Sequence, residues 1–305
     1  LLRSRGAECQ LVVLKTTADR VQDRPLHEIG GKGLFIKELE EALLCADADL
    51  AIHSLKDMTA RLDRRFALPC ILRRHQPADL LIFRADIAQA QGITAGDLRI
   101  FGPEALAGLP ALTIGTGSLR RQALLRKVAP QLKAVGIRGN VDTRLRKLAA
   151  GEWDAIILAE ASIERLAIAG LTSARLNPNW FIPCAGQGAL AIETRSQDTL
   201  LNLWLGQFDH AITSSAVRIE RAVLAGLGGD CNMPFGCYVH FNDGSWSAQA
   251  AVYNGNGQAA EADCRLAAGE VSEPALAAAI AARLRAGGAA KILSSLGLHV
   301  PEEYR

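Results

Sequence analysis

Cys231 is the residue of this chain best suited to covalent chemistry. It follows Gly228-Gly229-Asp230 and precedes Asn232-Met233-Pro234. Cysteine is the strongest nucleophile among the common side chains, and a glycine-rich loop is a poor place for a structural cysteine. No histidine and asparagine are arranged around it as in a cysteine protease. A buried, unreactive thiol stays open as the alternative.

Asp57 is a candidate for proton transfer and charge stabilisation. It ends the polar cluster His53-Ser54-Leu55-Lys56-Asp57, directly after a predicted strand at 49–54. In a basic cleft, a carboxylate can stabilise a cationic intermediate and exchange protons with a substrate. An ordinary surface carboxylate is the alternative that these residues alone leave open.

A dense group of basic residues lies between positions 119 and 147, where six arginines and three lysines face one acid, Asp142. Five of them are expected on solvated helix faces: Arg126, Lys127, Lys133, Arg146 and Lys147. The others lie near helix N-termini, in or beside loops that follow predicted strands: Arg120, Arg121, Arg138 and Arg144. The helix dipole disfavours cations there. These four are therefore expected to meet an anion, and the guanidinium fork suits a carboxylate.

Two glycine-rich loops, Gly30–Gly33 and Gly115–Ser118, each precede a predicted helix. Backbone N–H groups at such helix starts can bind anions, although ordinary turns explain many of these loops. Neither loop matches the P-loop or the dinucleotide-binding pattern. Phosphate is therefore not specifically indicated.

Short apolar runs alternate with helical patterns through the first two thirds of the chain. Strands are predicted at 10–15, 49–54, 70–73, 112–114, 134–137 and 155–159. This alternation predicts an α/β fold with mostly parallel sheets, whose ligands bind at the carboxyl ends of the strands. After about residue 205 the pattern changes: helices are predicted at 212–225 and 272–286, and turns at Asp243-Gly244 and Asn254-Gly255. A separate, smaller α+β domain is expected there.

The composition restricts the class of protein. A chain of 305 residues is too long for one ordinary core and predicts two or three domains. A net charge of +2 gives no reason to expect nucleic acid or a membrane surface, and no apolar run reaches the length of a membrane span. The seven cysteines are widely spaced without a CxxC pair, so neither a disulfide framework nor a metal site is expected. Reduced thiols favour a cytoplasmic enzyme.

Several segments together carry a family resemblance: GGKGLFIKELEEALL, AIHSLKD, TIGTGSLRRQ, GIRGNVDTRL, EWDAIILA, IPCAGQGALAIE and GGDCNMPFG. In order and spacing they resemble the motifs of hydroxymethylbilane synthases, also called porphobilinogen deaminases. The resemblance implies two doubly wound lobes like those of periplasmic binding proteins, followed by a small α+β domain. The expected bounds are 1–75 with 189–206 for domain 1, 76–188 for domain 2 and 207–305 for domain 3.

The same resemblance implies the activity: deamination of porphobilinogen and its head-to-tail polymerisation into hydroxymethylbilane, for haem biosynthesis. Asp57 matches the catalytic aspartate, and Cys231 matches the cysteine that holds a dipyrromethane cofactor through a thioether. Further cofactor-binding positions are matched by Ser54, Lys56, Thr116, Ser118, Arg120, Arg121, Gly139 and Arg144. Substrate-binding positions are matched by Lys32, Arg74, Arg138, Arg165 and Gln187. A monomer without nucleic-acid or membrane partners is expected.

The chain departs from the family pattern in a few places. Gln76-Pro77-Ala78-Asp79 replaces Asp-Pro-Arg-Asp, Ala18-Asp19 replaces Gly-Asp, and Gly117 replaces a serine. The family's first strand and most of its first helix have no counterpart, so the strands at 10–15 and 49–54 are expected to flank a gap or an unrelated segment. We expect the chain without that strand to be unstable or inactive.

Two alternatives stay open. One is a two-lobed anion-binding protein without turnover, which would need neither Cys231 nor Asp57. The other is an inactive relative of the enzymes, which is favoured if the first strand is naturally absent.

Overall fold

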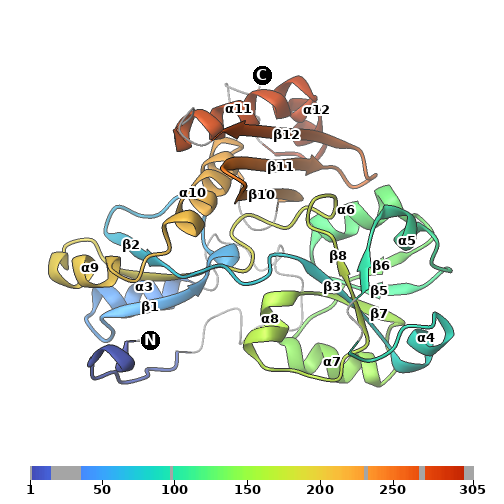
Figure 1. The fold of residues 1–305 in the computed structure, drawn as a ribbon, viewed down its shortest axis with the longest axis horizontal. Helices are drawn as coiled ribbons and strands as arrows, with labels where there is room; N and C mark the ends of the chain where they lie inside the picture. The colour runs from blue at the N-terminus through green and yellow to red at the C-terminus, as the bar shows by residue number, and fades with distance from the viewer. Residues whose placement is uncertain (1, 15–35, 97–98, 230–232, 268–271, 299–305) are drawn as a thin grey trace.

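The computed structural model describes residues 2–14, 36–96, 99–229, 233–267 and 272–298, and its strands form three sheets (Figure 1). Two sheets with their helices make two lobes, named lobe 1 and lobe 2 below. The third sheet belongs to domain 3, which lies above both lobes in Figure 1. The predicted fold class, two α/β lobes followed by a small α+β domain, is confirmed.

Lobe 1 contains a three-stranded antiparallel sheet in the order β1–β9–β2. Its elements are η1 (Arg3–Arg5), α3 (Lys37–Leu44), β1 (Leu50–Ser54), η2 (Leu55–Asp57), β2 (Phe66–Ile71), β9 (Leu190–Arg195) and α9 (Thr199–Gly206). Helix α3 packs Leu43 against Ala51 of β1, while α9 packs Leu205 against Ile192 of β9. Since β9 lies far along the chain, two separate stretches of sequence build this lobe.

The predicted strand at 10–15 is wrong for the residues that the structure describes. Residues 10–14 form neither helix nor strand, and Leu11 and Val13 are 82% and 79% exposed; Lys15 lies outside the described residues. Strand β1 pairs with β9, and the described part of the chain supplies no strand on its other side. The expected pair of strands around a gap is therefore not formed. An apolar run becomes a strand only where a neighbour accepts its hydrogen bonds, and the local pattern does not supply that neighbour.

Lobe 2 contains a six-stranded sheet in the order β4–β8–β3–β7–β5–β6. Its strands are β3 (Asp79–Phe83), β4 (Arg99–Phe101), β5 (Thr113–Gly115), β6 (Lys133–Val135), β7 (Ala155–Ala159) and β8 (Ser173–Leu176). Its helices are α4 (Ala85–Ala90), α5 (Pro103–Ala107), α6 (Leu119–Val128), α7 (Val141–Ala149) and α8 (Glu160–Arg165). Two apolar clusters, one on each face, bury the sheet. As predicted, most of its pairings are parallel, although β3 runs antiparallel to both of its neighbours.

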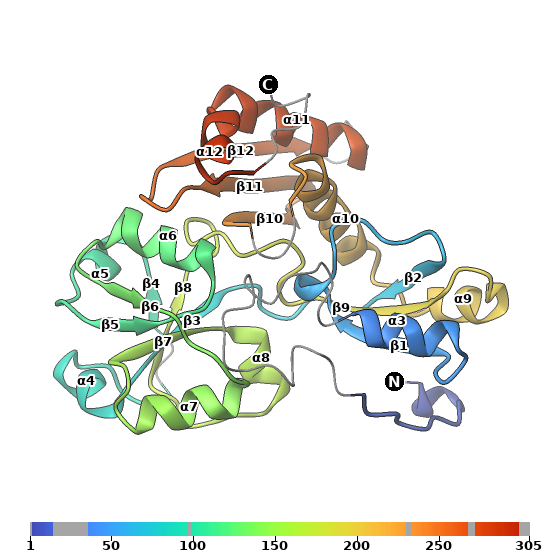
Figure 2. The ribbon, with the colours of Figure 1, turned by 180° about the vertical axis from the view of Figure 1, so that it is seen from behind.

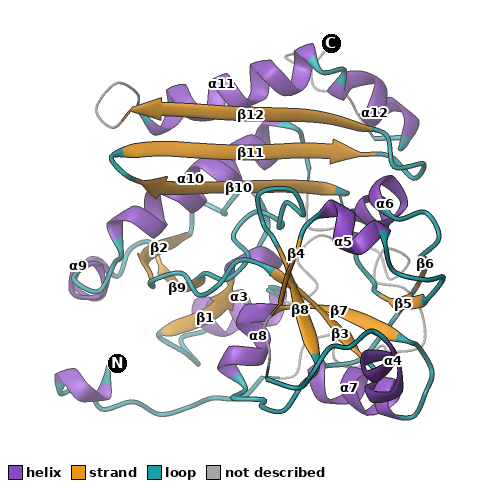
Figure 3. Ribbon diagram, turned by 45° about the vertical axis from the view of Figure 1, so that its right-hand side comes forward, coloured by secondary structure: helices purple, strands orange, loops and turns teal. Residues whose placement is uncertain are grey.

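Domain 3 packs three helices on one face of an antiparallel sheet, whose strands lie side by side in Figure 3. Its elements are α10 (Ala211–Gly226), β10 (Phe235–Asn242), β11 (Ser245–Tyr253), β12 (Ala259–Ala267), α11 (Glu273–Ala286) and α12 (Ala289–Ser295). Both predicted turns are confirmed. Asp243 and Gly244 have φ values of 50° and 71°, as a two-residue hairpin requires.

Domain 3 contacts both lobes. Ala251 and Tyr253 of β11 are buried in the core of lobe 2, and Val217 of α10 is buried with apolar residues of lobe 1. From the other side, α10 is seen to reach from the domain 3 sheet toward β2 of lobe 1 (Figure 2). Among the described residues, no helix combines the length and apolar character that a membrane span requires.

Candidate functional site

Asp57 lies at the end of the short η2 turn that follows β1. The N–H of Leu55 donates to the carbonyl of Ala189 at 3.0 Å, and the N–H of Met58 donates to the carbonyl of Leu55 at 3.2 Å. Leu55 and Met58 are buried, whereas Asp57 is exposed and Ser54 and Lys56 are half-buried. The turn is therefore anchored by its apolar residues and presents its carboxylate outward.

Arg144 of α7 and Arg165 of α8, both in lobe 2, interact electrostatically with Asp57. Burial lowers the pKa of Arg144 to about 10, with Arg121 and Arg138 adding to the decrease and Asp57 opposing it. Burial also lowers the pKa of Arg165, and Asp57 again acts in the opposite direction. Both guanidinium groups stay charged at neutral pH. The structure thus brings a carboxylate of lobe 1 together with a cationic group of lobe 2.

Neither Arg144 nor Arg165 forms a direct ion pair with a carboxylate among the described residues. Arg144 donates from Nε to the carbonyl of Gly139 at 2.8 Å, and Arg165 donates from Nη2 to the carbonyl of Gly188 at 2.6 Å. The Nε of Arg165 is buried without a hydrogen-bond partner in this part of the chain. These side chains are held by backbone carbonyls, so their remaining N–H groups can bind an external carboxylate.

Arg120 and Arg121, in contrast, bind an internal acid. Arg120 Nη2 lies 2.8 Å from Asp79 Oδ2, and Arg121 Nη2 lies 2.7 Å from Asp79 Oδ1. Gln187 Nε2 donates to Asp79 Oδ1 at 2.9 Å, and all four side chains are buried. Burial raises the pKa of Asp79, but Arg121 and Arg120 outweigh it and hold that pKa well below its ordinary value. The Nε atoms of both arginines are buried without a hydrogen-bond partner among the described residues.

Two helix starts lie beside these arginines. Ser118 caps α6, where its Oγ accepts from the N–H of Arg121 at 3.5 Å, and Thr116 Oγ1 accepts from the N–H of Ser118 at 3.3 Å. Gly139 precedes α7 with a φ of +100°, and a Cβ there would lie 2.7 Å from Cγ2 of Thr143. Only glycine fits this position without strain. The predicted loops therefore do open helices at the carboxyl ends of β5 and β6.

Arg74 is engaged within the protein. Its Nη1 lies 2.7 Å from Oε1 of Glu220, and its Nε donates to the carbonyl of Gln187 at 2.8 Å. The fully buried Glu220 also accepts from the N–H groups of Gly186 and Val239, at 2.7 and 2.8 Å. Arg74 and Gln187 thus join the two segments that cross between the lobes, and Glu220 ties both of them to domain 3.

Lys32, Cys231 and the loop Gly30–Gly33 lie outside the described residues. The residues on either side of the Cys231 loop lie close together: a Cβ on Gly229 would be 2.4 Å from the sulfur of Met233. Cys184, Cys237 and the other cysteines among the described residues are free thiols.

Sequence reasoning missed the buried acids that organise this region. Asp79 was singled out only as part of a departure from the family pattern, while Glu193 and Glu220 were not singled out at all. A signal was available, because Asp79 opens the run DLLIF, in which every residue is buried, and Glu193 lies within the apolar strand β9. A charge inside such a run requires a partner of opposite charge or a hydrogen bond.

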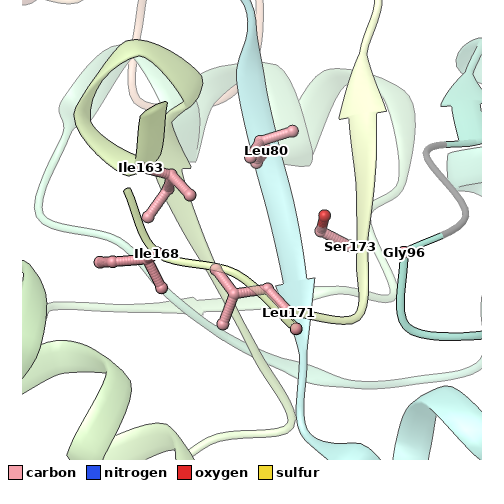
Figure 4. Close-up of a pocket in the computed structure, with 7 residues that line it drawn as sticks. Leu80, Gly96, Ile163, Ile168, Leu171 and Ser173 are labelled. Atoms are coloured by element: carbon pink, nitrogen blue, oxygen red, sulfur yellow. The ribbon is translucent and has the colours of Figure 1, made fainter. Parts of the chain in front are cut away.

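A separate apolar cavity of about 170 Å³ lies in lobe 2 (Figure 4). It is lined by Leu80, Gly96, Ile163, Ile168, Gly170, Leu171 and Ser173. None of the residues predicted to bind cofactor or substrate lines it, so it is not part of the candidate site.

Comparison with known proteins decides the family. A family model described as porphobilinogen deaminase, dipyromethane cofactor binding domain, matches residues 1–202. The porphobilinogen deaminase of Albidiferax ferrireducens is 40% identical over 298 residues, which cover 97% of this chain and 89% of the relative. That of Ralstonia nicotianae is 40% identical over 301 residues, covering 97% of this chain and 85% of the relative. The chain belongs to the porphobilinogen deaminase family. The suspected family relationship is thereby confirmed, and so is the predicted kind of enzyme, a transferase.

Solved structures outside the porphobilinogen deaminase family show a slight likeness. An amino acid ABC transporter substrate-binding protein, AbpA from Streptococcus pneumoniae, is 16% identical with a TM-score of 0.31, covering 59% of this chain and 68% of that chain. An ancestral cationic amino acid solute binding protein is 13% identical with a TM-score of 0.33, covering 56% and 66%. At these scores the likeness adds nothing to the family assignment.

Proposed function

We propose that this chain deaminates porphobilinogen and joins the units head to tail on a dipyrromethane primer, which is bound through a thioether to Cys231. The product is hydroxymethylbilane, a linear tetrapyrrole used in haem biosynthesis. The observation that carries the proposal is the exposed carboxylate of Asp57, which interacts electrostatically with Arg144 and Arg165, in a member of the porphobilinogen deaminase family. A carboxylate and unpaired guanidinium groups suit a substrate that carries both an ammonium leaving group and carboxylates.

Asp57 acts at the reacting carbon in this proposal. Loss of ammonia from porphobilinogen leaves a cationic, electrophilic methylene pyrrole, and the carboxylate stabilises that cation in the transition state. The free α-carbon of the terminal pyrrole then forms the new carbon–carbon bond, and the proton it loses restores its aromatic ring. Asp57 is placed on a turn with buried anchors, so its carboxylate needs little reorganisation during the reaction.

Arginines of lobe 2 bind the acetate and propionate groups in this proposal. Arg138, Arg144 and Arg165 hold the incoming substrate and the growing chain, with Lys32 from outside the described residues. Each charge-assisted hydrogen bond of this kind contributes about 1.5–3 kcal/mol. Further carboxylate or cofactor contacts are assigned to Ser54, Lys56, Thr116, Ser118, Gly139, Arg120 and Arg121.

For Arg120 and Arg121 the proposal is limited by their contacts. Asp79 accepts from one Nη of each arginine and a backbone carbonyl accepts from the other, while the buried Nε of each has no hydrogen-bond partner among the described residues and is a donor available to the primer. Their unpartnered state fits an anionic group bound beside them. Arg74 and Gln187 are proposed to act on substrate only through the position of the crossing segments.

We also propose the domain bounds 1–75 with 189–206, 76–188 and 207–305. The three separate sheets support them, because lobe 1, lobe 2 and domain 3 share no strand. A cytoplasmic monomer without nucleic-acid or membrane partners completes the proposal. Its free cysteines suit a reducing compartment, and light scattering of the purified protein measures the oligomeric state.

Mass spectrometry of the purified protein tests the central proposal. The chain should be heavier than its sequence by one dipyrromethane adduct, and Cys231→Ser should lack that adduct. Cys45→Ser is the matched control, because Cys45 is an exposed free thiol that is not among the residues assigned to the site, and it should keep the adduct. An adduct retained on Cys231→Ser, or a fully active protein without any adduct, would overturn the assignment.

A further inference from the structure

His53 and Glu193 form a buried pair directly beside the Asp57 turn. His53 precedes Ser54 at the end of β1, and its Nε2 lies 2.9 Å from Oε2 of Glu193 on β9. The side chains are only 5% and 0% exposed. The second carboxylate oxygen of Glu193, Oε1, is buried and has no hydrogen-bond partner among the described residues. A buried carboxylate oxygen in this state needs a positive charge nearby.

Arg221 of α10 interacts electrostatically with this carboxylate from domain 3, four residues after Val217, which is itself buried against lobe 1. Burial lowers the pKa of Arg221, and Glu193 is the charge that opposes the decrease. The side chain is half-buried, and in the part of the chain that the structure describes it forms no ion pair with another acid. The surroundings also contain Glu40 of α3, whose pKa is raised first by burial and then by Glu193. Arg221 thus offsets the charge of Glu193, the fully buried acid of this group.

Apolar contacts join α10 to the turn that carries Asp57. Val217 lies one helical turn before Arg221, on the same face of α10. It is fully buried in a cluster with Leu55 and Met58, the residues that anchor the Asp57 turn. Helix α10 therefore meets this part of lobe 1 through an apolar contact and an electrostatic one.

The position of α10 in the sequence gives this contact a consequence for the reaction. The helix ends at Gly226, and Cys231 follows in the next loop. We propose that His53, Glu193 and Arg221 act as one group of positioning residues, which fixes the Asp57 turn relative to the helix that leads to Cys231. This inference rests on the proposed function, in which the carboxylate of Asp57 must meet a chain attached to that cysteine. Misplacing reacting groups by about 1 Å can lower a rate about 100-fold.

A double-mutant cycle tests the inference. Glu193→Gln and Arg221→Gln should each lower kcat about 10-fold, while KM for porphobilinogen stays within about 2-fold, because neither residue touches substrate. The kcat of the double variant should be about as low as that of the less active single variant, since the effects of residues that act as one group are not additive. Arg221→Lys keeps the charge and should recover most of the lost kcat.

Arg218→Gln is the matched control. Arg218 lies on the same helix, but its ion pair with Glu273, at 2.9 Å, stays within domain 3. It should keep kcat within about 2-fold of the unchanged protein. The proposal would be overturned if the losses of kcat in the cycle multiply, or if Arg218→Gln loses as much kcat as Arg221→Gln. It would also be overturned if Arg221→Lys is as slow as Arg221→Gln. If Glu193→Gln does not fold, the two Arg221 variants decide the question.

Amide hydrogen exchange separates failure of this inference from failure of the proposed function, because it does not depend on turnover. Exchange at residues 54–58 should become faster in Arg221→Gln than in the unchanged protein, and it should stay unchanged in Arg218→Gln. Equal exchange in all three proteins would overturn the inference even if the enzyme makes hydroxymethylbilane. Faster exchange in a protein without turnover or adduct would support the inference and contradict the proposed function.

Discussion

Two pairs of arginines in lobe 2 differ in what they face. Arg120 and Arg121 are buried on Asp79, which neutralises one of their charges and binds both side chains directly. Arg144 and Arg165 are held by backbone carbonyls, and no direct ion pair compensates their partial burial among the described residues. The first pair is bound by an acid of the protein itself, and the second pair keeps its charge available.

The comparison teaches that the density of basic residues in a sequence does not identify a binding site. All of these arginines were expected to meet anions, and Arg120 and Arg121 meet one that the protein itself supplies. A binding arginine is better recognised by a charge that burial penalises more than the nearby acids of the protein offset, which is the state of Arg144. The predictions below test this division between the two pairs.

The largest expected effect is at the acid that faces the second pair. Asp57→Asn keeps the shape of the side chain but removes the charge that stabilises the cationic intermediate, so kcat should fall about 100-fold or more. Steady-state kinetics on porphobilinogen measure it. Asp63→Asn, an exposed acid of the same lobe, should leave kcat unchanged. Near-normal turnover of Asp57→Asn would mean that another group stabilises the cation.

Removal of Asp79 should affect stability most. Asp79→Asn leaves two buried guanidinium groups without their acid, and the free energy of unfolding should fall by about 3–5 kcal/mol. Chemical denaturation at pH 7 measures it. Asp86→Asn breaks an exposed pair with Arg84 and should cost less than about 1 kcal/mol. A small loss at Asp79 would mean that the first pair needs no internal acid.

The difference in stability between Asp79→Asn and the unchanged protein should also depend on pH. The pKa of Asp79 is lowered in the folded state, so its contribution is fully present above its unfolded pKa of about 3.9. It is lost as the pH falls from there through the folded pKa. The two stability curves should therefore approach each other below about pH 4 and run parallel between pH 5 and 8.

The smallest expected effect concerns Arg144. Arg144→Gln removes a charge that burial penalises, so the melting temperature should stay the same or rise, whereas KM for porphobilinogen should rise about 10-fold through one lost charge-assisted hydrogen bond. Arg146→Gln, on the exposed side of the same helix, should change neither quantity. A destabilised Arg144→Gln protein would place Arg144 with the structural pair instead.

Much of the fold followed from local patterns. The strand at 155–159, the helix from Leu119 and the hairpin at Asp243-Gly244 were predicted where the structure has them, because each depends on residues close together in sequence. The strand at 10–15 was predicted on the same kind of pattern and was wrong. Strands β3, β4, β8 and β9 were missed, and each of them pairs with strands far along the chain.

The site was predictable only in part, for a similar reason. The turn that carries Asp57 and the helix starts after β5 and β6 follow from local sequence. The choice that Arg121 makes between Asp79 and an external carboxylate depends on a contact across 42 positions. The pair His53–Glu193 spans 140 positions. Local reasoning can state that a buried charge needs a partner, but it does not identify the partner.

The order of strands in lobe 1 has a consequence for how the chain is made. Strand β9 lies between β1 and β2, yet it begins at Leu190, after the last strand of lobe 2 has ended at Leu176. A chain leaving the ribosome at about 5–20 residues per second therefore exposes β1 and β2 for several seconds without their common neighbour. Lobe 2 can complete its sheet during this time, whereas lobe 1 must wait. We expect the newly made first lobe to be the part of the molecule most dependent on chaperones, because its unpaired strand edges are open to other chains until β9 arrives.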